Sequence, residues 1–170
     1  MARIDLIEEE CAVVEMEIEK EVKDDSKIEL LETVPGVGKL TAMAFVAYIG
    51  DGSRFKNASQ VVASIGLVPK IDMSGSINRY GSISKHGCGY LRSLLVMASW
   101  SLTRSKEGGA LKDKYNFMVK YQSKNKRKAI VAIARKLAEL LYIILKTEKP
   151  YEKRNFHQPV INITGMTEVA

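Results

Sequence analysis

The chain has 170 residues, of which 46% are hydrophobic and 27% are charged, and this composition excludes a disordered or low-complexity protein. No apolar stretch reaches the roughly 18 to 20 residues that cross a bilayer, and the two cysteines form no disulfide framework. Because the first residues are also acidic rather than basic and then apolar, we expect a soluble protein of the reducing cytoplasm, with no membrane partner.

The charge is unevenly distributed along the chain. The 26 Lys and Arg residues and 20 Asp and Glu residues give a formal net charge of +6. Residues 1–32 contain 12 acidic and 4 basic side chains, a net charge of −8, so the remaining 138 residues carry +14. Such a basic body favours a polyanionic partner, although a solvated basic surface would give the same composition.

The first segment has the apolar spacing of a heptad seam. Apolar residues recur at alternating spacings of three and four, with glutamates between them, at Ile4, Ile7, Cys11, Val14 and Ile18. Two readings stay open: a coiled coil that makes a homo-oligomer, or an amphipathic helix that lies on its own domain. We therefore separate residues 1–27, an acidic connector helix, from a domain over residues 28–149 and a loosely ordered tail over residues 150–170.

Helical periodicity dominates the rest of the chain and predicts a mainly α fold. Ser26 and Glu29 have the spacing of a capping box, and Asn57 or Ser59 is the expected cap of a later helix. Glycine-rich residues 67–89 lack a helical period, and their short runs 70–73 and 82–84 could pair as a small β-hairpin. The expected helices are 28–34, 39–49, 57–65, 90–104, 110–122 and 126–146, and Gly66 is the expected stop of the third. The stripe expected to face inward from the fifth helix is Leu111, Tyr115, Met118 and Tyr121, and that from the last helix is Ile130, Ile133, Ala134, Leu137, Leu141 and Ile144. Cys88, between glycines, is expected to be a small loop residue.

The segment 28–50 has the pattern of a helix-hairpin-helix motif. Gly36 and Gly38 lie in a Pro-Gly-Val-Gly turn, where glycine lets the backbone turn tightly and approach a ligand. Free amides at the start of the second helix favour an anion, and Lys39 adds a full positive charge there. Such a hairpin would bind a nucleic-acid phosphate without reading sequence, although the same turn also occurs as plain structure.

The irregular segment 66–92 is the richest polar cluster in the chain. It combines four serines with Arg79, Lys85 and Arg92, and a loop of this length inside a domain is usually functional or disordered. A serine oxygen can attack phosphorus while cations stabilise the charge on the phosphoryl oxygens. The residues alone leave three readings open: a phosphate-binding loop, a structural hairpin or a catalytic centre.

An ordered series of short motifs resembles the C-terminal domain of the DEDD insertion-sequence transposases, the serine-dependent bridge recombinases. The motifs are Val-Pro-Gly-Val-Gly (34–38), Ala-Tyr-Ile-Gly-Asp (47–51), Arg-Phe (54–55), Gly-Leu-Val-Pro (66–69), Ser-Gly (74–75), Ile-Ser-Lys-His-Gly (83–87), Leu-Arg (91–92) and Ala-Arg-Lys-Leu (134–137). The resemblance covers about residues 28–146 and keeps the family order.

The resemblance implies a role for particular residues. The family serine of the Ser-Gly pair falls on Ser74, followed by Gly75, and is understood to attack a DNA phosphodiester and hold the strand covalently. Arg79, Lys85 and Arg92 would then flank the phosphate. In this family an RNA guide can pair with donor and target DNA, so the expected partners are DNA and a guide RNA.

The sequence departs from the family pattern in one respect. The family also has an N-terminal RNase-H-like domain whose four acidic residues bind divalent metal, whereas the acidic residues before Ile28 follow heptad spacing. We therefore expect a truncated gene product, an isolated fragment or an expression product, which holds no Mg²⁺ or other cofactor of its own and binds DNA without completing strand transfer.

A second basic cluster lies at the start of the last predicted helix. Lys126, Arg127 and Lys128 oppose the helix dipole there, so a polyanion explains them better than helix stability does, although a solvated face remains open. Two alternatives to a transposase domain also stay open. One is a non-enzymatic helix-hairpin-helix scaffold of a recombination or repair complex, and the other is a dimerisation protein built on the acidic helix. The transposase reading places the protein in the bacterial or archaeal cytoplasm, at the nucleoid.

Overall fold

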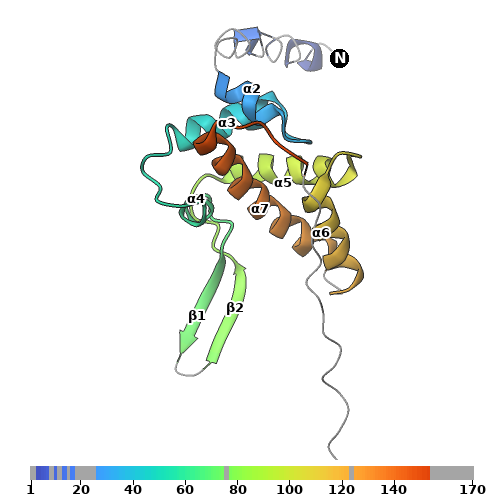
Figure 1. Ribbon diagram of the computed structural model, residues 1–170. Helices are drawn as coiled ribbons and strands as arrows, with labels where there is room; N and C mark the ends of the chain where they lie inside the picture. The colour runs from blue at the N-terminus through green and yellow to red at the C-terminus, as the bar shows by residue number, and fades with distance from the viewer. Residues whose placement is uncertain are drawn as a thin grey trace, which may run out of the picture.

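The computed structural model describes residues 3–7, 10, 13, 14, 16, 17, 26–74, 77–122 and 125–153, without the side chains of residues 71–80. The mainly α fold is confirmed, with one two-stranded antiparallel sheet (Figure 1). No helix of the described part is long and apolar enough to cross a membrane. In chain order the elements are α2 (Ser26–Glu32), α3 (Lys39–Ile49), α4 (Ala58–Ile65), β1 (Pro69–Ser74), β2 (Ile77–Ile83), α5 (Gly89–Arg104), α6 (Gly109–Lys120) and α7 (Lys126–Thr147).

Local residue chemistry sets most of these boundaries. The Asn57 side chain caps α4 by accepting a hydrogen bond from the Gln60 amide at 3.0 Å, as expected from the sequence. Gly66, at φ 82°, ends the same helix in the left-handed conformation. The prediction for α2 was wrong by two residues, because Ser26 is itself the first helical residue and the helix ends at Glu32.

Helix α7 is the central element of the helical body. It packs against α2, α4, α5 and α6, while α3 packs against α2 and α5 (Figure 1). The apolar stripe predicted for α7 is buried throughout, at Ile130, Ile133, Ala134, Leu137, Leu141 and Ile144. An inward position for Tyr121 was wrong, because this residue follows the end of α6 and is 59% exposed. Burial of these stripes supplies the main stabilisation of the fold.

The heptad seam lies partly outside the described residues, since Cys11 and Ile18 are not among them. Residues 3–7, 10, 13, 14, 16 and 17 are helical. Ile4, Ile7 and Val14 are 50 to 59% exposed, so these seam positions are not buried on the helical body. The described residues therefore do not support the reading in which this helix packs on its own domain.

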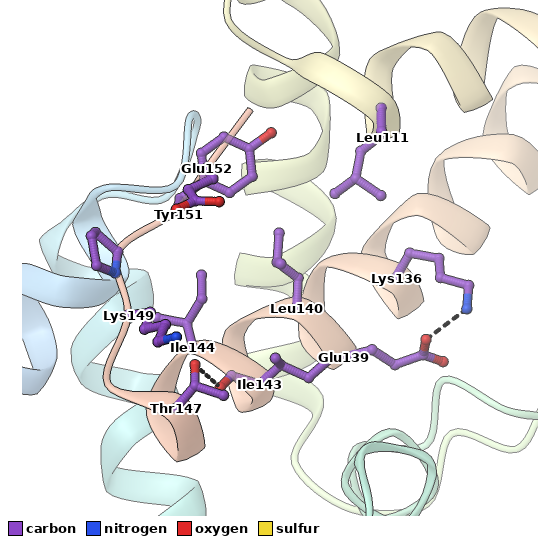
Figure 2. Close-up of a pocket in the computed structure, with 12 residues that line it drawn as sticks. Leu111, Lys136, Glu139, Leu140, Ile143, Ile144, Thr147, Lys149, Tyr151 and Glu152 are labelled. Atoms are coloured by element: carbon purple, nitrogen blue, oxygen red, sulfur yellow. Dashed lines mark hydrogen bonds and ion pairs between the residues drawn. The ribbon is translucent and has the colours of Figure 1, made fainter. Parts of the chain in front are cut away.

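The segment that follows α7 is tied to the helical body at two points. The Tyr151 amide donates to Thr33 Oγ1 at 2.9 Å, and Lys153 forms an ion pair with Glu107 at 2.8 Å. These contacts hold residues 151–153 of the predicted tail on the helical body, and residues 154–170 lie outside the described part. Between this segment, the start of α6 and the second half of α7 is an open apolar groove of about 520 Å³ (Figure 2).

Candidate nucleic-acid interface

The β-hairpin projects from the helical body on the side of α4 (Figure 1). Its strands pair with each other, and neither makes more than a few contacts with any helix. The predicted strand runs 70–73 and 82–84 lie within this hairpin or at its edge, but β1 and β2 are longer than expected. The irregular segment of the sequence thus forms an arm with two ordered strands.

Ser74 is the last residue of β1, at the end of this arm that is farthest from the helices (Figure 1). Its Cα pairs with that of Ile77, and Arg79 pairs in register with Asp72. Ser74 therefore lies in the last residue pair of the sheet, and Arg79 lies further along β2, opposite a residue of unlike charge. Gly75 lies outside the described residues.

Lys85 and Arg92 lie at the opposite end of the arm, where it joins the helices. Lys85 follows β2 and is exposed, with a left-handed backbone at φ 58°. Arg92, in the first turn of α5, is half-buried, and its Nη1 donates to the carbonyl oxygen of Ile65 at 2.8 Å. The structure thus separates these two cations from Ser74 by the length of the arm (Figure 1).

The two glycines of the turn between α2 and α3 have different surroundings. A Cβ on Gly36 would lie 2.7 Å from the carbonyl oxygen of Ala98 and 2.5 Å from the amide nitrogen of Leu102, so the Cα of Gly36 faces α5. Gly38 is exposed, and a Cβ there would meet nothing within 4 Å. It is the N-cap of α3, directly before the half-buried Lys39. The open side of this turn therefore lies at Gly38 and the first turn of α3.

The start of α7 presents the second basic cluster to solvent. Lys126, Arg127 and Lys128 are all exposed. Asn125 caps the helix, since its side-chain oxygen accepts from the Arg127 amide at 2.9 Å. The positive end of the helix dipole and three cationic side chains thus lie together.

These candidate groups lie at separate corners of the molecule. In Figure 1 the α2–α3 turn is on the far side of the body from the hairpin tip, and α7 begins near the end of α6. The apolar groove of Figure 2 is lined by none of these groups. Such spacing suits an extended ligand better than a small molecule.

The described residues do not fit a divalent metal site. They contain no group of three or more His, Cys, Asp and Glu side chains that could hold a metal ion. Asp51 accepts hydrogen bonds from the amide and the hydroxyl of Ser53, which lower the pKa of its carboxyl. This carboxylate therefore serves a local turn in the loop after α3.

Sequence reasoning missed two residues that shape this surface. Cys88, expected to be a small loop residue, is the N-cap of α5, and its Sγ accepts from the Leu91 amide at 3.5 Å. The hydroxyl of Tyr142 donates to the Phe55 carbonyl oxygen at 2.8 Å and holds the loop after α3 on α7. The Cys88 cap follows a local spacing of three residues, whereas the Tyr142 contact spans 87 positions and leaves no local signal.

Comparison with known proteins identifies the family. Residues 28–116, more than half of the chain, match the model of the Transposase IS116/IS110/IS902 family, and the chain belongs to this family. It is 34% identical over 126 residues to a pilin gene-inverting protein of Moraxella lacunata, a match that covers 74% of this chain and 38% of the relative.

Two further relatives are named as transposases. A probable family 20 transposase of Pseudomonas aeruginosa is 32% identical over 145 residues, covering 85% of this chain and 43% of the relative. The transposase for insertion sequence element IS1111A of Coxiella burnetii is 31% identical over 137 residues, covering 81% of this chain and 38% of the relative. The chain thus spans about two fifths of the length of these curated relatives.

Proposed function

We propose that this chain is the DNA-binding, serine-bearing portion of a DEDD-type transposase. The observation that carries the proposal is that Ser74 is the last residue of β1, at the end of an arm that projects from a basic helical body. A residue at the end of such an arm can reach a DNA backbone that the helical body binds. Membership of a transposase family supports DNA as the bound polymer.

The proposed reaction exchanges one phosphate ester for another. The Oγ of Ser74 attacks the phosphorus of a DNA phosphodiester and forms a Ser–O–P bond. One P–O bond of the DNA breaks, its oxygen leaves as a free hydroxyl after taking up a proton, and the serine proton is lost. Reversal of these steps with another DNA hydroxyl rejoins the strand and releases Ser74. Gly75 and Arg79, close to Ser74 in sequence, would contact the attacked phosphate.

The helical body would hold the DNA through phosphate contacts at two places. Gly38 and Lys39 would present the start of α3 to one phosphate, with Gly36 shaping the turn. Lys126, Arg127 and Lys128 would bind others, and Lys85 would add a contact at the base of the arm. Contacts of this kind position a duplex without specifying its sequence. A guide RNA would offer the same phosphate chemistry.

Strand transfer would also need metal chemistry, and the residues that the structure describes contain no group of three or more acidic, His or Cys side chains that could hold the ion. In the proposed transposase, Mg²⁺ would be held by four acidic residues of an RNase-H-like domain. We therefore expect the 170-residue chain to bind DNA without cleaving it. The exposed seam positions Ile4, Ile7 and Val14 would join this chain to a second copy in the working assembly.

DNA affinity measured against salt concentration tests the binding part of the proposal. We expect the logarithm of the binding constant to fall steeply with the logarithm of salt concentration, by about 0.9 for each neutralised phosphate. Changing Lys126, Arg127 and Lys128 together to Gln should reduce this slope by about 2 to 3 and weaken binding to all sequences alike. A matched control changes three other exposed lysines outside the arm, Lys106, Lys146 and Lys149, to Gln and should leave the slope nearly unchanged.

Two results would contradict the proposal. Absence of DNA binding at low salt would remove its basis. DNA cleavage by the purified chain with Mg²⁺ would show that the chain is complete as an enzyme. The non-enzymatic scaffold alternative differs in one measurement, because Ser74→Ala would then have no effect on recombination in an assembled complex.

A further inference from the structure

The base of the β-hairpin is a junction where two chain segments touch with almost no space between them. A Cβ on Gly66 would lie 2.0 Å from the carbonyl oxygen of His86, and one on Gly87 would lie 1.9 Å from that of Ser64. Both glycines have positive φ, 82° and 85°. Side chains at either position would force the segments apart.

Arg92 joins the same two segments through one nitrogen. Its Nη1 donates to the carbonyl oxygen of Ile65 at 2.8 Å, to that of His86 at 3.2 Å and, more weakly, to that of Gly87 at 3.5 Å. Ile65 is the last residue of α4, and His86 and Gly87 lead from β2 into α5. One guanidinium therefore binds the segment entering the arm and the segment leaving it.

Other contacts surround this junction and hold it against the helical body. The hydroxyl of Tyr48, from α3, donates to the Ser64 carbonyl oxygen at 2.8 Å. The Lys85 amide donates to the Gly66 carbonyl oxygen at 3.2 Å, and a Cβ on Gly89 would lie 3.4 Å from Arg92 Nη2. The junction thus draws together α3, α4, the arm and the start of α5.

The two cations at this junction are placed for different tasks. Lys85 is exposed, whereas the half-buried Arg92 uses Nη1 on backbone carbonyls. If this guanidinium bound a phosphate instead, the carbonyl oxygens at the end of α4 and between β2 and α5 would lose its hydrogen bonds. The contacts of Arg92 therefore favour a role in holding the protein backbone over a role in binding a DNA phosphate.

We propose that Arg92 is a positioning residue that sets the direction of the Ser74 arm relative to the helical body. The proposal rests on the function proposed above, in which Ser74 at the far end of the arm attacks DNA. Because Ser74 lies at the other end of β1, a small rotation at the base becomes a larger displacement at the serine. Arg92 acts on the reaction through this geometry and not by contact with the phosphate.

Salt dependence separates a positioning residue from a phosphate ligand. In the 170-residue chain, Arg92→Gln should leave the slope of DNA affinity against salt unchanged, whereas loss of a phosphate contact lowers it by about 0.9. Lys85→Gln is the matched control at the same junction and should lower the slope. A drop of about 0.9 with Arg92→Gln would overturn the proposal.

Hydrogen exchange provides the second readout. Arg92→Gln should speed exchange of the Ser84 and Lys85 amides about tenfold, because these amides bond to Val68 and Gly66 across the base of the arm. Amides within α7 should exchange as in the wild type, whereas a general loss of stability would speed both groups alike. Arg92→Lys should restore part of the protection, since an ammonium group can also donate to carbonyl oxygens.

A milder variant keeps the proposal testable if Arg92→Gln does not fold. Tyr48→Phe removes only the bond to Ser64 and should speed the same Ser84 and Lys85 amides a few-fold with no change of salt slope. Unchanged exchange at these amides in every variant that folds would overturn the proposal.

The effect on catalysis requires a transposase assembled from this chain and the part of the Pseudomonas aeruginosa relative that it does not match. There Arg92→Gln should reduce strand transfer about 100-fold with DNA affinity within about twofold, as expected for a misplaced reacting group. Full strand transfer by Arg92→Gln would overturn the positioning role. Full strand transfer by Ser74→Ala would instead overturn the proposed function, and the exchange and salt results would still stand.

Discussion

Replacing Gly36 by Ala tests whether the α2–α3 turn is held by packing against α5. The added Cβ would lie 2.5 Å from the Leu102 amide nitrogen, 2.7 Å from the Ala98 carbonyl oxygen and 2.9 Å from the Leu102 Cα. All three atoms belong to the backbone of α5, at its buried residues Ala98 and Leu102, so no side chain can rotate away. The turn or the helix must therefore move.

The expected cost has two parts. A non-glycine residue at φ 84° costs about 1 to 2 kcal/mol, and forcing extra volume into a packed contact costs about 1 to 3 kcal/mol. The sum, about 2 to 5 kcal/mol, is a large fraction of the roughly 5 to 15 kcal/mol that stabilises a typical domain. The melting temperature should fall by roughly 10 °C.

Gly38→Ala provides the matched control within the same turn. Its Cβ would meet nothing within 4 Å, and its φ of −100° is open to any residue. Thermal unfolding followed by circular dichroism should show less than about 1 kcal/mol of destabilisation. Because the new methyl group would point into open space beside α3, this variant should also weaken DNA binding. Equal stability of the Gly36→Ala and Gly38→Ala proteins would refute the packing argument.

Three further predictions concern other contacts. Tyr142→Phe keeps the edge-to-face contact with Phe55 but loses the hydrogen bond to its carbonyl, so urea unfolding should show a loss of about 1 to 2 kcal/mol. Asn125→Ala removes the cap of α7 and should cost about 1 kcal/mol in the same assay, whereas Asn125→Asp should cost almost nothing. The ion pair with Lys153 lowers the pKa of Glu107 below 4.5 and raises that of Lys153 above 10.5. The contribution of this ion pair to stability should therefore be full at neutral pH. It should fade as the pH falls through the lowered pKa of Glu107, and again as the pH rises through the raised pKa of Lys153. NMR titration of both side chains can follow these changes, and an unshifted Glu107 titration would contradict the pairing.

Much of the fold follows from local sequence signals. The apolar stripe of α7, the Asn57 cap and the Gly66 stop are all found where short-range chemistry predicted them. Each signal involves residues close in sequence, where helix periodicity and capping preferences act. Helix α3 has the predicted bounds, Lys39–Ile49, for the same reason.

The arrangement of the candidate site could not be predicted in the same way from the sequence. Glycines 36 and 66 could be recognised as turn residues, but their close approach to Ala98 and His86 depends on how distant elements pack. The bond from Arg92 to Ile65 spans 27 positions. A sequence pattern shows that a cation is present, whereas only the packed structure shows which oxygen atoms surround it.

The attacking role of Ser74 can be tested directly by trapping its bond to DNA. In the assembled transposase with Mg²⁺, a DNA substrate with a nick that lets the leaving strand diffuse away should leave the cut strand attached to the protein. Mass spectrometry of the digested product should place the phosphate on Ser74, and Ser74→Ala should abolish the adduct while Ser82→Ala retains it. Strand transfer that proceeds without an adduct, or an adduct on another residue, would contradict the account.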